Sequence, residues 1–215
     1  RRDFDKNMTI LKSTFCALLA ALFIVSSGVV QAGEMEDSAT AFVQDLEKEA
    51  IASLADTSKP RADRVNAFRS LFLEKFAVGV IGRWTLGRSW RKATPEEQKE
   101  FLMLFEDLMV ATYVDRLSSY AGEGLKYTKT VPVDENMSTV HTEIVRPDQA
   151  DARPISVLWR VGRQGELYKV LDVVVQGASM SLTLQKEFTA IVRNKGSVAG
   201  LIEELRKKTV ELNQT

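Results

Sequence analysis

Residues 82–122 read GRWTLGRSWRKATPEEQKEFLMLFEDLMVATYVDRLSSYAG, an aromatic and basic segment followed by a long helical pattern. Thr94 is a good N-cap, and Pro95 sits at the first helical position, where its missing N–H costs nothing. Glu97 completes a T-x-x-E capping box with Thr94. We therefore expect a helix of about seven turns that begins at Pro95.

This helix carries two apolar stripes, although a helix that packs on one core needs only one. The pattern leaves two interpretations open. The helix is buried on both sides in an ordinary core, or one stripe packs against protein while the other lines an apolar cavity. The first stripe consists of Phe101, Phe105, Leu108, Thr112 and Tyr113, and the second of Met103, Val110, Val114, Leu117 and Ala121.

The composition is that of an ordinary globular protein. The chain has 215 residues, 45% of them hydrophobic, which predicts one domain or one domain with two lobes. It has 29 basic and 29 acidic residues, so the formal net charge is zero. No basic face indicates nucleic acid as a partner, and no acidic run indicates disorder.

The first 32 residues have the pattern of a secretory signal. Positive charges precede an apolar run at residues 15–25, and residues 30–32, VQA, form a small-x-small cleavage site. Cleavage after Ala32 would leave a mature chain of residues 33–215, which we expect to be soluble in an exported compartment. The apolar run is short for a membrane span.

Three details of this signal bear on the mature chain. Because the sequence opens with Arg, Met8 is a candidate start, and the pair Arg1-Arg2 leaves twin-arginine export as a second option beside the general secretory route. Cys16, the only cysteine, lies inside the signal. We therefore expect no disulfide, thiolate nucleophile or cysteine metal site in the mature chain.

The rest of the chain predicts an α+β fold, with helices, then a sheet, then helices. A helical part covers residues 33–121, with helices at 33–55, 61–75 and from Pro95, and an apolar turn with two glycines at 76–82. After residue 122 the period changes to two, which predicts four mostly antiparallel, curved strands within residues 125–177, one face covered. Two closing helices follow within 178–212. The expected strands are 125–133, 137–146, 154–163 and 168–176, and the closing helices are 179–192 and 198–212.

With these segments in place, the chain resembles the Mla-type periplasmic phospholipid-binding family (the MlaC or toluene-tolerance auxiliary family). The resemblance covers nearly the whole mature chain. There are two departures: Gln176 stands where an acidic residue is common, and residues 162–166 lack a tryptophan often found before the fourth strand. The matching segments are GRWTLGRSWR at 82–91 with TPEEQ at 94–98, YKVLDVVVQGASM at 168–180 with Phe188, and GLIEELR at 200–206.

The resemblance implies a carrier, not an enzyme. Proteins of this family hold phospholipid acyl chains in an apolar cavity between sheet and helices, with the headgroup near solvent, and need no cofactor beyond this cargo. Their partners are an outer-membrane lipoprotein–porin complex and an inner-membrane ABC transporter with an MCE subunit. A monomer is expected. A hopanoid or another lipid as cargo, and a ligand-free periplasmic interaction module, are the alternatives.

Two groups of residues are candidates for the site. For the apolar group the competing interpretation is core packing, and for the basic group it is ordinary surface charge. Basic residues near the expected entrance are candidates for contact with a headgroup or an acidic docking surface: Arg83, Arg88, Arg91 and Lys92. Apolar side chains are the candidate lipid contacts: Phe76, Val80, Ile81, Trp84, Leu86, Phe105, Met109, Tyr113, Val140, Ile144, Val157, Trp159, Val161, Val170, Val174 and Met180.

An enzyme is the weaker hypothesis. His141 is the only histidine, and no H-E-x-x-H or cysteine pair accompanies it as a zinc site would require. Residues 177–181, GASMS, lack the last glycine of a nucleophile elbow, so Ser179 is better explained as a helix N-cap. Asp172 lies in the fourth expected strand, where a structural partner such as an arginine is the common explanation of a buried carboxylate.

Overall fold

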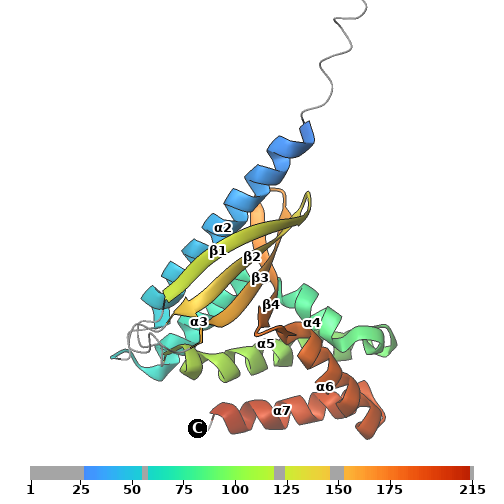
Figure 1. The fold of residues 1–215 in the computed structure, drawn as a ribbon. Helices are drawn as coiled ribbons and strands as arrows, with labels where there is room; N and C mark the ends of the chain where they lie inside the picture. The colour runs from blue at the N-terminus through green and yellow to red at the C-terminus, as the bar shows by residue number, and fades with distance from the viewer. Residues whose placement is uncertain (1–26, 55–57, 119–123, 146–152, 214–215) are drawn as a thin grey trace, which may run out of the picture.

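The computed structural model describes residues 27–54, 58–118, 124–145 and 153–213. Within them, six α-helices pack on a five-stranded antiparallel open sheet, so the predicted α+β class is confirmed (Figure 1). The predicted signal at 1–32 lies largely outside the described residues, and its cleavage stays a prediction.

Three helices precede the basic segment, and three follow it. Helix α3 has the predicted bounds, and α2 already begins at Ser27. A 3₁₀ helix, η1, links α4 to α5. The helices are α2 (Ser27–Leu54), α3 (Arg61–Lys75), α4 (Val78–Leu86), η1 (Gly87–Lys92), α5 (Pro95–Ser118), α6 (Met180–Lys195) and α7 (Val198–Asn213).

The strands form a meander in chain order, each antiparallel to the next. The first four follow the predicted strands closely because the alternation of apolar and polar residues marks one covered face. The fifth is a two-residue strand that the sequence analysis missed. The strands are β1 (Gly124–Asp134), β2 (Met137–Val145), β3 (Ile155–Gln164), β4 (Leu167–Val175) and β5 (Ala178–Ser179).

Helix α5 begins as its sequence predicts. The Thr94 Oγ1 accepts a hydrogen bond from the Glu97 N–H at 3.2 Å, and Glu97 Oε2 accepts one from the Thr94 N–H at 2.9 Å. This reciprocal pair is the capping box. It fixes the start of the longest helix after the basic segment.

The predicted turn at residues 76–82 is wrong, because Val78–Leu86 is helix α4. Gly82 lowers local helix propensity, but tertiary packing outweighs that effect. A Cβ at Gly82 would lie 2.7 Å from Leu102 Cδ2 and 3.2 Å from Phe105 Cδ1. The glycine therefore lets α4 approach α5 closely, which no local pattern reveals.

Helix α5 packs against both α6 and α7. Phe101 and Phe105 pack with Phe188 of α6 in edge-to-face contacts. Val110 and Val114 belong to the same core as residues of α7, and the two helices run side by side (Figure 1). Met103 departs from its predicted stripe, since it is 53% exposed.

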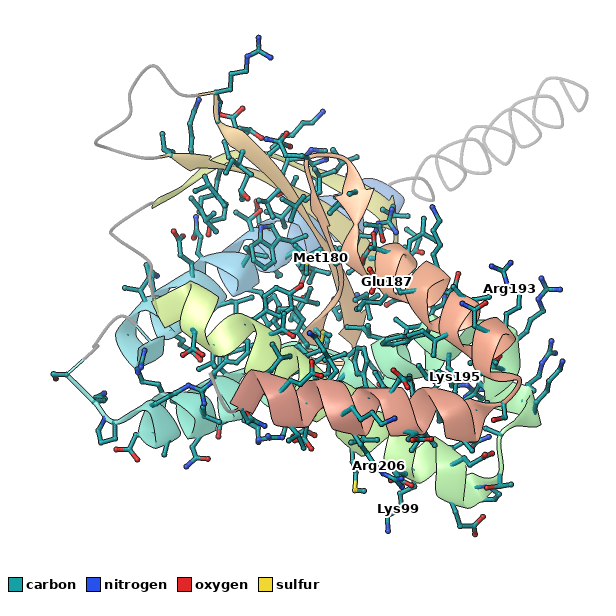
Figure 2. The ribbon with its side chains drawn as sticks, turned by 90° about the horizontal axis from the view of Figure 1, so that it is seen from below. Lys99, Met180, Glu187, Arg193, Lys195 and Arg206 are labelled. Carbon is teal, nitrogen blue, oxygen red and sulfur yellow. The ribbon has the colours of Figure 1, made fainter. Side chains whose placement is uncertain are left out.

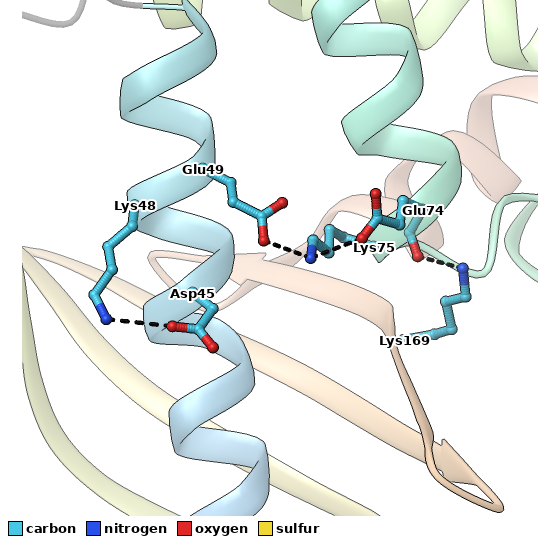
Figure 3. A network of polar contacts seen from close by, with 6 residues as sticks. All are labelled: Asp45, Lys48, Glu49, Glu74, Lys75 and Lys169. Carbon is cyan, nitrogen blue, oxygen red and sulfur yellow. Dashed lines mark hydrogen bonds and ion pairs between the residues drawn. The ribbon is translucent and has the colours of Figure 1, made fainter.

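A network of charges ties α2, α3 and β4 together (Figure 3). Lys75 Nζ lies 2.7 Å from Glu49 Oε1 and 2.9 Å from Glu74 Oε1. Lys169 of β4 donates to the Glu74 carbonyl at the end of α3. Desolvation lowers the pKa of Lys75, but the hydrogen bonds to Glu49 and Glu74 outweigh it, so that its pKa is raised overall. The charged form thus stabilises this junction.

Of the helices in the described part of the chain, none combines the length and the apolar character needed to cross a membrane.

Candidate functional site

A cavity of about 340 Å³ lies between the inner face of the sheet and the helices. This volume is at the lower end of the roughly 300–1,000 Å³ of ligand pockets. Ile51, which is 40% exposed, lies on its rim. The lining residues are Val43, Leu46, Glu47, Ala50, Ile51, Phe68, Leu71, Phe72, Phe76, Ile81, Phe105, Met109, Tyr113, Leu125, Ile144, Trp159, Asp172, Val173, Met180, Ser181 and Leu184.

Helix α5 supplies one wall. Phe105, Met109 and Tyr113 recur at i, i+4 and i+8, so they share one side of the helix and all line the cavity. Val110 and Val114, on another side, are buried in the helical core. The second interpretation of the double stripe therefore fits the structure, because α5 packs against protein on one side and borders a cavity on the other.

The sheet supplies the opposite wall, and an irregularity in β4 decides which residues face it. Arg160 pairs with Asp172 but the next residue, Val161, pairs with Val170, which leaves Leu171 as an extra residue. An extra residue reverses the alternation of faces along a strand. Val173, paired with Trp159, therefore lines the cavity in place of the predicted Val174.

Two carboxylates line the cavity, and both accept hydrogen bonds from other groups of the protein. Glu47 on α2 accepts hydrogen bonds from the Leu125 N–H and the Tyr127 hydroxyl, each at 2.8 Å. These bonds hold the edge strand β1 against α2. Glu47 thereby joins the two elements that flank one side of the cavity.

Asp172, only 6% exposed, anchors the start of α6. It accepts hydrogen bonds from Ser179 Oγ at 2.7 Å, Ser181 Oγ at 2.6 Å and the Ser181 N–H at 3.1 Å. Arg160 Nη1 lies 3.4 Å from the carboxylate. The structure thus supplies the arginine partner that the sequence suggested, and adds two serines.

The other polar atoms at the wall are also engaged. Trp159 Nε1 donates to Thr142 Oγ1 at 3.0 Å, and that hydroxyl donates to the Val157 carbonyl at 3.1 Å. Because these groups are satisfied within the protein, the cavity offers a ligand mostly apolar contact. Of the described residues that line it, only Glu47 and Asp172 carry a charge, and both are acidic.

The structure brings together half of the predicted lipid contacts. Phe76, Ile81, Phe105, Met109, Tyr113, Ile144, Trp159 and Met180 line the cavity, and Figure 2 shows Met180 near the centre of the molecule. Their contact with lipid stays a prediction. Leu86, Val140, Val157, Val161, Val170 and Val174 are buried away from it.

Helix α2 explains part of this difference. Val140 and Val161 face the same side of the sheet as the cavity, but Met35, Ala39 and Val43 of α2 pack directly on them. Val170 is likewise covered by α2 and α3. At these strand positions the structure shows core packing.

Helices α2 and α3 also line the cavity with residues that were not predicted to contact lipid, which include Leu46, Phe68 and Phe72. Their helical spacing was visible, but it indicates only that they are buried. Whether the buried face meets another side chain or an open space depends on the separation of helix and sheet.

The predicted basic residues lie away from the cavity. Arg83, Arg88 and Arg91 border a separate groove on the outer side of α4, together with Val80 and Trp84, which are therefore not cavity residues. Lys92 is exposed and lines neither space. Ile81 on α4 and Met180 on α6 face the cavity, so these helices separate it from the basic residues.

Ser179 and His141, the residues considered for catalysis, lie in ordinary structural positions. Ser179 Oγ accepts a hydrogen bond from the Leu182 N–H at 3.1 Å, which confirms it as the N-cap of α6. His141 sits on β2 opposite Leu158, and desolvation together with the charge of Lys129 lowers its pKa. Within the described residues, no three His, Cys, Asp or Glu side chains group as metal ligands.

Known proteins resemble this chain over most of its length. The MlaC protein family matches residues 44–207. The intermembrane phospholipid transport system binding protein MlaC of Haemophilus influenzae is 22% identical over 212 residues, 94% of this chain and 95% of the relative. The fold is similar to that of a Ralstonia solanacearum phospholipid-binding protein solved with a phospholipid. The TM-score is 0.69 at 21% identity, over 80% of this chain and 97% of that one. The chain belongs to the MlaC family.

Proposed function

We propose that this chain is a periplasmic carrier that binds phospholipid acyl chains in the cavity between the sheet and the helices. The observation that carries the proposal is the cavity itself, which is walled by apolar side chains and whose polar groups are already hydrogen-bonded. The relatives, named as a phospholipid transport binding protein and a phospholipid-binding protein, point to the same cargo.

The physical chemistry of the cargo explains why such a cavity is needed. Each methylene left in water costs about 0.8 kcal/mol, so two chains of roughly sixteen carbons would cost on the order of 25 kcal/mol. Moving the acyl chains from a bilayer into the cavity is nearly neutral in free energy, because the chains are already in an apolar environment in the bilayer. Partner proteins must then govern loading and release.

The charges at the wall indicate how the lipid lies. Glu47 and Asp172 are acidic, and no described cation lines the cavity. A phosphate is disfavoured there, so the headgroup stays outside while the chains enter. The volume of about 340 Å³ is modest, and a two-chain lipid would require the walls to move apart.

In this proposal the chain shuttles lipid between an outer-membrane lipoprotein–porin complex and an inner-membrane ABC transporter with an MCE subunit. It acts as a monomer, with phospholipid as cargo and without catalysis. Export by the N-terminal signal, with cleavage after Ala32, brings it to the periplasm.

The test is native mass spectrometry of the chain 33–215, purified from a bacterial periplasm without detergent and followed by lipid extraction. A mass excess matching one or two phospholipids supports the carrier. A hopanoid would keep the mechanism and change the cargo. A bare protein that also refuses added phospholipid would overturn the proposal in favour of an interaction module.

A further inference from the structure

A second hollow, of about 1080 Å³, lies between α4, η1 and α6. We call it the basic groove. Five cationic side chains line it, and no carboxylate among the described residues does so. Its lining residues are Gly79, Val80, Arg83, Trp84, Gly87, Arg88, Ser89, Trp90, Arg91, Gln185, Lys186, Thr189, Ala190 and Arg193.

The cations of the basic groove are not used to hold the fold together. Arg83 lies 5.8 Å from the centre of the Trp90 ring, a cation–π contact. Within the part of the chain that the structure describes, none of the five forms an ion pair. Lys195, close to Arg193 in sequence, does pair with Glu204 at 2.7 Å. The groove therefore concentrates positive charge on a protein whose net charge is zero.

Two apolar side chains stand among these cations. Val80 is 62% exposed and Trp84 is 46% exposed, and they lie one turn apart on α4. The Trp84 carbonyl accepts a hydrogen bond from Gln185 Nε2 at 2.8 Å, which fixes α4 against α6. The fold thus holds an indole and a valine at the surface of the same groove as the five cations.

This combination fits one kind of partner. Tryptophan is enriched at the boundary between bilayer and water, and basic residues are attracted to anionic headgroups. A bilayer surface offers both an anionic layer and an apolar layer directly beneath it. An acidic protein segment would match the cations but leave the exposed Val80 and Trp84 unexplained.

We propose that the basic groove docks the protein on the surface of bilayers that contain anionic phospholipid. Arg83, Arg88, Arg91, Lys186 and Arg193 contact the headgroups, and Trp84 inserts among them. Docking here brings the membrane to the outer side of α4 and α6, whose inner residues Ile81 and Leu184 line the cavity. The proposal goes beyond the carrier function, because it concerns the surface and not the cargo.

The test is flotation of the purified, lipid-loaded protein with phosphatidylcholine vesicles that contain or lack phosphatidylglycerol. We expect association only with the anionic vesicles, weakened by salt. The double variant Arg88→Gln, Arg193→Gln should bind the anionic vesicles about 30-fold more weakly, since each cation near an anionic surface raises the affinity about fivefold. Trp84→Ser should lower the association that remains at high salt.

The matched control replaces two exposed lysines outside the groove, Lys99→Gln and Lys208→Gln, and should leave association within about twofold of the unmodified protein. Figure 2 shows Lys99 and Arg193 on different sides of the molecule. Thermal melting checks that both double variants remain folded.

Equal losses in the groove and control variants would overturn the proposal, as would equal association with both kinds of vesicle. Groove-dependent binding of polyglutamate without vesicle association would also overturn it and assign the groove to an acidic protein partner. Lipid occupancy by native mass spectrometry is measured separately, so failure of membrane docking and failure of the carrier function are distinguishable.

Discussion

Replacing Asp172→Ala would test how the fold joins its sheet to α6, the helix between the cavity and the basic groove. The carboxylate accepts three hydrogen bonds from Ser179 and Ser181, at 2.6 to 3.1 Å. Alanine removes the acceptor for all three. It also removes a negative charge from the positive end of the helix dipole at the start of α6.

The expected loss of unfolding free energy is about 3 kcal/mol. Ser181 is itself buried, so its fixed N–H is left without an acceptor, which costs about 1–3 kcal/mol. The serine hydroxyls can rotate to other acceptors, so their losses add less than fully. The Arg160 pair contributes about 1 kcal/mol or less, because the Arg160 side chain is half-exposed. Asp172→Asn keeps one acceptor oxygen and should cost roughly half as much.

The assay is urea unfolding followed by far-UV circular dichroism on delipidated protein, since bound lipid would raise the apparent stability. For a chain of this size, about 3 kcal/mol corresponds to a fall in Tm of roughly 6–12 °C. The matched control is Asp134→Ala, which removes one acceptor from an exposed turn, where it bonds the Asn136 N–H at 2.8 Å. We expect it to cost less than about 1 kcal/mol.

Two results would refute the reasoning. One is a loss below about 1 kcal/mol for Asp172→Ala, a value within the range of a surface change. The other is a loss for Asp134→Ala as large as that for Asp172→Ala. Either result would mean that the shared buried acceptor does not anchor the start of α6.

Three further predictions follow from the packing, the charges and the cavity. Gly82→Ala should cost about 1–3 kcal/mol in urea unfolding by overpacking, whereas Gly79→Ala on the same helix, with open space around it, should be neutral or slightly stabilising. Equal effects would contradict this. Because the pKa of Lys75 is raised in the fold, its charge stabilises the fold fully below the ordinary lysine pKa of about 10.4, and this stabilisation is lost as pH rises from there through the raised pKa; the stability gap to Lys75→Met should narrow over that range, and a constant gap would count against it. Ile144→Asp should lower copurified lipid phosphorus at least about tenfold, while Val145→Asp on the opposite face of β2 should not; equal losses would argue against lipid in the cavity.

Local patterns in the sequence were enough for most element boundaries. The capping box at Thr94 and Glu97 marks the start of α5, and the N-cap at Ser179 marks the start of α6. Alternation marks the first four strands. These features depend on hydrogen bonds and side-chain periods within a few residues, so they can be predicted from the local sequence without knowledge of tertiary contacts.

The local sequence did not predict the structure at positions where two elements pack or pair with each other. Residues 78–86 form a helix, although two glycines favoured a turn, because Gly82 packs against α5. The extra residue at Leu171 places Val173 in the cavity wall and turns Val174 away. In each case the deciding contact comes from a neighbouring element, and it depends on how the two elements pack or pair.

Sequence patterns were sufficient for the fold class, for the α-helices other than α4, for the first four strands and for an apolar face on these elements. Where those faces meet side chains and where they meet a void depends on tertiary packing. It also decided that Arg83, Arg88 and Arg91 lie across α4 from the cavity, in a groove completed by Arg193 of α6. Periodicity reports which side of an element is buried, whereas a cavity or a charged groove depends on the spacing between elements, which is set by the packing of the whole chain.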